Sequence, residues 1–435
     1  MGEDLDRGQI LLGEMQARLM SDQRTLPGFA EQSEHPAFVP SRASGLSRLD
    51  RFVARAGRHY ASNRNYDYGP EKRGNVSCLS PWVRHRLVTE EDVLRAVLAR
   101  HAPSTAEKFI QEVFWRTYFK GWLEQRPSVW TAYQNGVAQG LRALEKDRVM
   151  AIDYEGAIEG RSGIDGFDQW ARELVATGYL HNHARMWFAS IWIFTLRLPW
   201  ELGADFFLRH LIDGDPASNT LSWRWVAGLH TKGKTYQARA SNIAKYTEGR
   251  FRPEHQLSGS AEPLIEEIEH SRQPIPIADV LDKNDFLLLV TEEDGSIDAQ
   301  LPRAPAAVLG LLATKARSPL LIGAVAQAFA DGAVNDAVDR IGAPSRMVRS
   351  AEDWSISILD AAKAAGVSTV VTSYAPVGPV ASRLKAAAPV LRDAQITLKQ
   401  VRRSYDDLAW PHATKGFFAL KQKIPQVLQG LGLAG

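Results

Sequence analysis

Charged and amide side chains recur in residues 181–225, a segment that is otherwise aromatic and aliphatic. If this segment is helical, Asn182 and Arg185 lie one turn apart and can share a face. Asp213 and Asp215 follow in the sequence IDGDPAS. Charged groups in apolar surroundings are seldom buried unless they are paired or bound to something. A structural ion pair between Arg185 and Asp213 would satisfy two costly charges. The alternative is that this cluster contacts a heteroaromatic ring that carries several hydrogen-bond donors and acceptors.

Tryptophan is concentrated in the same half of the chain. Ten of the twelve tryptophans lie before Pro253, and residues 181–225 include Trp192, Trp200, Trp223 and Trp225. Each of them could simply belong to the core. Tryptophan rings at near-contact spacing would also conduct an electron or a hole from a buried cofactor to the surface. Together with the polar side chains, they indicate a large, flat, polar-edged ligand in a helical pocket.

A second group of candidate residues lies in the sequence FIQEVFWRTYFKGWL, residues 109–123. On a helix, Glu112, Trp115 and Arg116 fall on one face. A carboxylate beside an indole could hydrogen-bond a polar substrate while the ring stacks on it. The alternative is a solvated pair of Glu112 with Arg116, with Trp115 in the core.

Hydroxyl and basic side chains could bind phosphate. The sequence GNVSCLSP places Ser77 and Ser80 before a helix, and a helix N-terminus suits a phosphate or pyrophosphate. Simple helix capping is the alternative. Basic residues that could face DNA phosphates, or equally form a solvated surface, are Lys232, Lys234, Arg239, Lys245, Arg250 and Arg252.

Composition limits the class of protein. The chain has 435 residues, which suggests two or three domains, and its net charge of +2 does not by itself indicate a nucleic-acid binder. Cys78 is the single cysteine, so a disulfide framework and a cysteine-ligated cluster within one chain are excluded; we expect it to be a small core residue. The start of the sequence, MGEDLDRGQ, does not resemble a signal peptide. The longest apolar run, residues 186–196, is shorter than the roughly 20 residues that span a bilayer. We expect a cytoplasmic protein.

The spacing of apolar residues differs between the two parts of the chain. Apolar residues at helical spacing predict helices at residues 9–20, 48–61, 90–101, 106–124, 167–177 and 184–196. Thr89, followed by three acidic residues, is typical of a helix N-cap. Residues 252–276 are polar and proline-containing, which indicates a linker with one short helix at 263–269.

Strands alternate with helices beyond Val280. We predict strands at residues 286–291, 319–324, 346–349, 369–373 and 395–400, and helices at 304–316, 327–341, 356–365 and 377–388. Such alternation favours a doubly wound parallel sheet. The predicted organisation is therefore multidomain: an all-α domain at 1–253, a linker at 254–280, and a smaller α/β Rossmann-like domain at 281–435.

The motifs of the first half resemble the photolyase/cryptochrome flavoprotein family, in particular its bacterial cyclobutane-dimer photolyases. The chain carries, in the order and approximate spacing of that family, Tyr60 with Arg64 and Asn65, then VSCLSP, IQEVFWR, TGYLHNHARM and LIDGDPASNTLSWRW. The resemblance covers about residues 38–253. It implies FAD in a bent conformation inside the helical domain.

The resemblance also implies roles for individual residues. Positions that contact the flavin phosphates and ribityl chain are held by Tyr60, Ser77 and Ser80. Flavin-contacting or flavin-pairing positions are held by Arg116, Asn182, Arg185, Asp213 and Asp215, and Asn219 matches the asparagine beside flavin N5. Positions lining the lesion cavity are held by Glu112, Trp115, Met186 and Trp225. Trp223 and Trp200 match the flavin-proximal and middle members of the electron-transfer chain.

Several positions depart from the family pattern. The outer tryptophan expected shortly before Gly163 is missing, and Tyr154 is the nearest aromatic residue. The paired glycines after Asn219 are replaced by Thr220, Leu221 and Ser222. Asn182 and Met186 stand where (6-4) repair enzymes place two histidines, which favours the cyclobutane type.

The order of the two halves is unusual for this family, which normally begins with an α/β antenna domain. Residues 286–425 resemble that domain moved to the end, with LLLVTEEDG as its first strand and GVSTVVTSYAPVGPVASRL as its fourth strand and following helix. WPHATKGFFALKQKIP resembles the segment that leads out of it. The arrangement suggests a circular permutation. The usual Arg-Asp-Leu-Arg after the first strand is absent, so whether an antenna chromophore binds, and which, stays open.

The resemblance implies a deoxyribodipyrimidine photo-lyase, which repairs cyclobutane pyrimidine dimers in DNA by light-driven electron transfer from reduced FAD. Its partner would be damaged DNA, and we expect a monomer. One alternative is a cryptochrome-like blue-light receptor without repair activity, which would not need Glu112 and Trp115 together. Another is a light-independent binding protein with a decayed flavin pocket.

Overall fold

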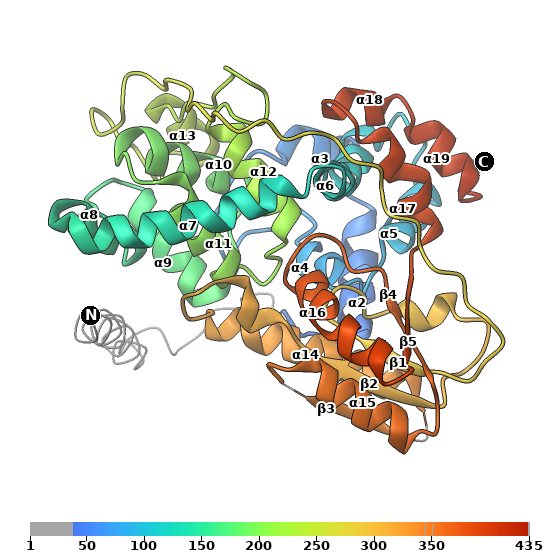
Figure 1. Cartoon of the computed structure of the whole chain (residues 1–435). Coiled ribbons are helices and arrows are strands. Elements are labelled where there is room, and N and C mark those ends of the chain that lie inside the picture. The colour runs from blue at the N-terminus through green and yellow to red at the C-terminus, as the bar shows by residue number, and fades with distance from the viewer. Residues whose placement is uncertain (1–37, 344, 350, 434–435) are drawn as a thin grey trace, which may run out of the picture. The chain divides into compact units, whose positions relative to one another are not determined.

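The computed structural model describes residues 38–343, 345–349 and 351–433 (Figure 1). The helix predicted at residues 9–20 lies outside this range. In the described residues the chain begins with helices and continues into a parallel sheet. This order agrees with the prediction of a helical first part followed by an α/β part.

The first part is helical throughout. Its elements are α2 (Arg42–Val53), α3 (Arg58–Asn63), α4 (Ser80–Arg84), α5 (Glu90–Leu98), α6 (Glu107–Glu124), α7 (Ser128–Lys146), α8 (Arg148–Ile158), α9 (Phe167–Thr177), α10 (Asn182–Ser190), the π-helical turn η1 (Ile191–Thr195), α11 (Trp200–His210), α12 (Pro216–Val226) and α13 (Ala240–Tyr246).

Local side-chain chemistry explains several helix boundaries. Thr89 and Asp92 form a reciprocal capping box at the start of α5, as the acidic first turn predicted. The single helix predicted at residues 48–61 is wrong, because the chain forms α2 and α3 instead. His101 bonds the carbonyl oxygen of Val53 at 2.8 Å, which satisfies the end of α2. Gly57 then provides the non-helical N-cap of α3.

The segment between the helices and the sheet is irregular. The short helix predicted at 263–269 is wrong, since these residues have no regular secondary structure. Their polar groups bond the helical part instead: the Leu264 amide donates to the Ala227 carbonyl at 3.0 Å, and Arg224 donates to Glu266 at 2.8 Å. These bonds replace the intrahelical bonds that a short isolated helix would make.

The second part contains a parallel sheet. Its strands are β1 (Leu287–Val290), β2 (Ala307–Leu311), β3 (Arg346–Arg349), β4 (Thr369–Ser373) and β5 (Thr397–Val401), in the order β3-β2-β1-β4-β5. α14 (Ala324–Ile341) packs on one face, and α15 (Trp354–Ala364) and α16 (Pro379–Asp393) pack on the other. The predicted doubly wound parallel sheet is therefore present. The short 3₁₀ turns η2 (Ile297–Gln300) and η3 (Thr314–Arg317) lie in its loops.

Two element predictions in this part are wrong. Residues 304–316 do not form a helix but contain β2, and residues 319–324 form no strand. β2 is buried along its whole length, and hydrophobic periodicity cannot distinguish a continuously apolar strand from a buried helix. Gly310 lies against α14, since a Cβ there would lie 2.7 Å from Val334 Cγ1.

After the sheet, the chain returns to the first helices. Its last elements are α17 (Ser404–Ala409), η4 (Trp410–His412), α18 (Phe417–Lys421) and α19 (Ile424–Gly430). Within them, Tyr405, Phe417 and Leu420 belong to the same hydrophobic cluster as residues of α2, α5 and α6. Figure 1 shows these last helices beside α5 and α6. The division into domains at residues 254–280 stays a prediction.

Gly121 permits this return, because a Cβ at this position of α6 would lie 2.8 Å from the Cα atom of Trp410. A Gly121→Ala variant is expected to lose about 1–3 kcal/mol of unfolding free energy through overpacking, which outweighs the helix propensity gained. Urea denaturation followed by circular dichroism measures the change. Gly416→Ala is the control, because no heavy atom lies within 4 Å of the added carbon. Equal stability of both variants would contradict this close approach.

Candidate functional site

Arg185 and Asp213 form the ion pair that the sequence suggested. Arg185 Nη2, on α10, donates to Asp213 Oδ2 at 2.9 Å, and its Nε donates to the Leu180 carbonyl at 3.0 Å. The guanidinium lies 5.3 Å from the ring centroid of Tyr179. Asp213 is buried, and its Oδ1 has no hydrogen-bond partner among the described residues. A buried carboxylate oxygen with free acceptor capacity calls for a further donor.

Asp215 is the centre of a buried ionic cluster. It caps α12 by accepting a hydrogen bond from the Ser218 amide at 2.8 Å. Its Oδ2 lies 3.3 Å from Arg116 Nη2, 3.4 Å from Lys120 Nζ and 3.8 Å from Arg84 Nε. Burial alone would raise the pKa of Asp215, but these three cations hold it well below its ordinary value. The carboxylate is therefore charged at neutral pH.

The same cations reach the carboxyl end of β1. Arg84 donates to Glu293 at 2.7 Å, and Lys120 donates to it at 3.2 Å. Burial would raise the pKa of Glu293, but Arg84 and Lys120 lower it to about 2. The sequence reasoning missed Arg84, Lys120 and Glu293. Two signals were available: Lys120 follows Arg116 by one helical turn, and Glu293 belongs to the acidic run directly after a buried strand.

Several buried polar atoms of α6, α12 and the preceding loop lack partners within the described part of the chain. They include Arg116 Nε, Asp213 Oδ1, Ser218 Oγ, Thr220 Oγ1 and Trp223 Nε1. Asn219 differs, because its Nδ2 donates to the Ala204 carbonyl at 2.8 Å and this fixes the amide. Donors and acceptors together fit a ligand with both kinds of group along its edge.

The residues predicted to face phosphate lie at the start of α4 and on α3. Ser77 Oγ accepts from the Leu79 amide at 3.3 Å, so it serves a local turn, and Ser80 is the first residue of α4. Tyr60 is buried edge-on against Phe109, with ring centroids 5.0 Å apart. Cys78 is buried as predicted. Its thiol lies close enough to Tyr179 and Arg185 to affect their pKa values, so this loop borders the Arg185–Asp213 pair.

Glu112 and Trp115 share a face of α6, but Glu112 does not form the pair with Arg116 that the sequence offered as an alternative. Glu112 pairs with Arg64, whereas Arg116 pairs with Asp215. The Glu112 side chain keeps 31% of its surface exposed. Trp115 stacks on Phe417 of α18, with ring centroids 3.8 Å apart and planes at 13°. No local pattern in the sequence could have indicated this contact, because about three hundred residues separate the two rings.

The other residues predicted to line a lesion cavity lie at the surface of α10 and α12. Met186 is half-buried, and Asn182, which was predicted to contact the flavin, is exposed at the start of the same helix. Trp225 is half-buried and stacks on Tyr236, with ring centroids 5.6 Å apart. These side chains are accessible to a ligand that approaches from solvent.

The buried tryptophans form close ring contacts. Trp223 meets Trp192 edge to face at 6.2 Å, and Trp192 meets Tyr154 at 5.9 Å. Trp200 lies in the same core, against Tyr133 at 6.0 Å. The sequence assigns no individual role to Trp192, whereas the structure places its ring in contact with that of Trp223.

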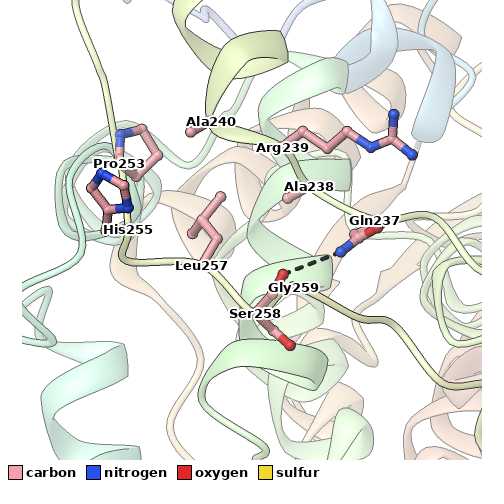
Figure 2. A pocket seen from close by; sticks show the side chains of 9 residues that line it. All are labelled: Gln237, Ala238, Arg239, Ala240, Pro253, His255, Leu257, Ser258 and Gly259. Carbon is pink, nitrogen blue, oxygen red and sulfur yellow. Dashed lines mark hydrogen bonds between the residues drawn. The ribbon is translucent and has the colours of Figure 1, made fainter.

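A surface pocket of about 430 Å³ lies beside α13, and Figure 2 shows its lining. Gln237 donates to the Ser258 carbonyl across it at 3.1 Å. The predicted flavin-site residues do not contribute to its lining. The six basic residues proposed to face DNA, among them Arg239 at this pocket, are all exposed.

Comparison with known proteins identifies the helical part. Residues 109–254 match the family described as the FAD binding domain of DNA photolyase. This part of the chain is similar to the photolyase/cryptochrome family. This match includes most of α6, Arg185, Asp213 and α12, and it confirms the predicted FAD cofactor. Tyr60, Ser77 and Ser80 precede the matched residues.

Named relatives agree with this similarity. The chain is 30% identical over 195 residues to the deoxyribodipyrimidine photo-lyase of Alkalihalophilus pseudofirmus, which is 44% of this chain and 38% of that protein. It is 26% identical over 246 residues to that of Synechococcus sp., which is 52% of this chain and 49% of the relative. The chain thus spans less than half the length of these curated photolyase relatives.

Solved structures of the family show partial similarity. A Synechocystis cryptochrome is 25% identical with a TM-score of 0.40, and the alignment covers 52% of this chain and 48% of that one. A class III photolyase from Agrobacterium tumefaciens is 24% identical with a TM-score of 0.40, and the alignment covers 53% and 48%. Among the described residues, no helix has the length and apolar character needed to cross a membrane.

Proposed function

We propose that this protein repairs cyclobutane pyrimidine dimers in DNA by light-driven electron transfer from reduced FAD. The observation that carries the proposal is the joint presence of Glu112 and Trp115 on one face of α6. The same helix reaches the Asp215 cluster through Arg116. A blue-light receptor would need the flavin site but would not need this pair of side chains.

The described residues fit FAD. Asp213 Oδ1 offers a buried acceptor for an N–H group of a flavin ring, and Arg185 holds that carboxylate in place. Asn182, Arg116, Asp215 and Asn219 would complete the contacts to the ring system, and we assign Tyr60, Ser77 and Ser80 to the phosphate and ribityl part. When bound and reduced, FAD supplies the electron upon absorbing blue light, and the protein supplies position and electrostatics. Whether a second, antenna chromophore binds is left open.

The exposed edge of α6 would receive the lesion. A damaged base pair is cheaper to flip out of the duplex than an intact one, which itself favours damaged sites. Arg64 orients the Glu112 carboxylate, which would then hydrogen-bond the pyrimidine edge and stabilise the negative charge that develops there. Trp115, Trp225 and Met186 would provide the apolar walls. The exposed basic residues would contact the DNA phosphates, and we expect one copy of the chain to act alone.

Replacing Glu112 by glutamine tests the proposal. The repair yield per absorbed photon is expected to fall about tenfold, the order of effect of losing a hydrogen bond to a charged group. The measurement follows the disappearance of dimers from a defined oligonucleotide, single- and double-stranded, under blue light and in darkness. Glu145→Gln, on an exposed position of α7, is the matched control. An unchanged yield in the Glu112 variant would remove Glu112 from the mechanism.

One observation favours the alternative of a blue-light receptor without repair activity. Phe417 covers one face of the Trp115 ring, so a lesion cannot stack on that face. A flavin-loaded protein that leaves dimers intact in the same light assay would establish this alternative over repair.

A further inference from the structure

The turn that follows α3 joins two parts of the proposed lesion site. Arg64, in this turn, pairs with Glu112 on α6. The next residue, Asn65, presents its backbone carbonyl to α10, where His183 Nδ1 lies 2.9 Å from the oxygen. Asn75 fixes the turn itself, because its Nδ2 donates to two carbonyl oxygens of the turn at 2.9 and 2.7 Å. One fixed turn therefore positions side chains on both α6 and α10.

The hydrogen bonds of His183 determine where its ring carries a proton. Because the Asn65 carbonyl can only accept, Nδ1 must donate in this bond. Burial lowers the pKa of His183 below its ordinary value, so the ring is neutral at pH 7 and Nε2 can accept. The Tyr236 hydroxyl lies 3.1 Å from Nε2 and therefore donates to it. His183 thus connects the turn to Tyr236.

Tyr236 in turn supports Trp225, one of the residues proposed to line the lesion cavity. The two rings stack with centroids 5.6 Å apart and planes at 29°, and the Tyr236 amide donates to the Val226 carbonyl at 3.2 Å. The His183 ring stacks on the buried Trp187, with centroids 4.0 Å apart and planes at 25°. The series that ends at Trp225 therefore rests on the buried core.

This series ends at a surface that a ligand can reach. Trp225 is half-buried, and so is Met186, which follows His183 by three residues on α10 and shares its face. A half-buried indole without support would change rotamer freely and would lose that freedom when a ligand binds. Holding Trp225 in place before binding avoids this entropic cost.

We propose that His183 and Tyr236 are positioning residues, which hold Trp225 in a fixed place relative to Glu112 before a lesion arrives. This inference rests on the proposed function, because it concerns the same lesion site. The two residues act through Trp225 and not on the reacting atoms. They therefore affect the binding of the lesion rather than the yield of the electron transfer that follows.

The affinity for a dimer-containing oligonucleotide tests this role in the flavin-loaded protein. Tyr236→Phe removes only the hydroxyl, and we expect the Kd for the lesion to rise about threefold to tenfold, as for one lost neutral hydrogen bond. The double variant with His183→Phe should bind no more weakly than His183→Phe alone, because the two substitutions remove the same bond.

Binding is measured by fluorescence anisotropy in the dark, and repair under blue light at saturating protein. The same oligonucleotide without a dimer is the control, and its Kd should not change. The repair yield per absorbed photon in the saturated complex should change by less than about twofold, because only binding is affected. An unchanged lesion affinity in Tyr236→Phe, or a loss of yield without a loss of affinity, overturns the proposal.

His183→Gln distinguishes positioning from packing. Glutamine carries both an acceptor and a donor, so it can bond Asn65 and Tyr236, whereas phenylalanine keeps only the stacking on Trp187. If His183 acts through its hydrogen bonds, His183→Gln retains the lesion affinity and His183→Phe loses it. The reverse order overturns the proposal. His59→Gln, at an exposed position of α3, is the matched control.

Fluorine nuclear magnetic resonance supplies a readout that needs no DNA. Tryptophan is replaced by 5-fluorotryptophan, and the Trp225 signal is assigned by its loss in Trp225→Phe. We expect this signal to shift or broaden in both Tyr236→Phe and His183→Phe, and to keep its position in His183→Gln. A Trp225 signal that is unchanged in Tyr236→Phe overturns the proposal. Because this variant lacks a single oxygen atom, the readout decides the matter even if His183→Phe fails to fold.

The two readouts separate this inference from the proposed function. If the Trp225 signal responds as expected but the unmodified protein repairs no dimers, the proposed function fails while the support of Trp225 by Tyr236 stands. If dimers are repaired and the Trp225 signal responds to neither substitution, only the positioning role fails.

Discussion

An Asp213→Asn variant should be purified without its flavin. The substitution removes the charge that compensates the Arg185 guanidinium, and it replaces an acceptor oxygen by an amide. Truncating one partner of a buried, hydrogen-bonded charge pair costs about 2–5 kcal/mol in binding. The affinity for FAD is therefore expected to fall at least about thirtyfold.

Flavin content is measured as the ratio of flavin to protein absorbance after purification, and again after incubation with excess FAD. Asp153→Asn is the matched control, because this aspartate is exposed on α8. Circular dichroism checks that the Asp213 variant retains its helices. A folded Asp213→Asn protein with full flavin occupancy would show that the pair does not hold the cofactor.

A Glu293→Gln variant should lose about 3 kcal/mol of unfolding free energy at neutral pH, because a pKa of about 2 instead of its ordinary 4.5 corresponds to a difference of this order. The folded pKa lies below the unfolded one, so the carboxylate contributes its full stabilisation above about pH 4.5. That contribution is lost as the pH falls toward 2. The difference between variant and unmodified protein should therefore shrink over this range.

Urea denaturation at a series of pH values measures this prediction. Glu269→Gln, in the exposed connecting segment, is the control and should show no comparable change. A deficit that stays constant from pH 7 down to pH 3 would mean that lost packing, rather than lost charge, destabilises the Glu293 variant. No deficit at all would mean that Asp215 alone satisfies Arg84 and Lys120.

Local sequence patterns predicted the elements whose bounds are determined by residues close to them in the sequence. α9 and β4 have the predicted bounds, because α9 is strongly amphipathic and β4 is a short β-branched run between turns. β2 was assigned to a helix, because a strand covered on both faces shows no alternation. The break between α2 and α3 depends on His101, which lies beyond the helix itself.

The contacts of the candidate site likewise include some that the sequence predicted and others that it could not. The Arg185–Asp213 pair joins two neighbouring motifs. It could be predicted because two opposite charges in one apolar segment are costly to bury unless they pair with each other. The partners of Asp215 come from α4 and α6, and Glu293 comes from the sheet. The contact of Phe417 with Trp115 and the contact of Tyr154 with Trp192 likewise depend on tertiary packing. Sequence spacing carries no information about such contacts.

The return of α17–α19 to α6 imposes an order on biosynthesis. The side of α6 that Trp410 and Phe417 cover is complete only once the ribosome has made the whole sheet, roughly tens of seconds after α6 itself emerges. During that interval the nascent helices carry an uncovered apolar surface. We expect a chaperone that binds the nascent chain to contact that surface of α6.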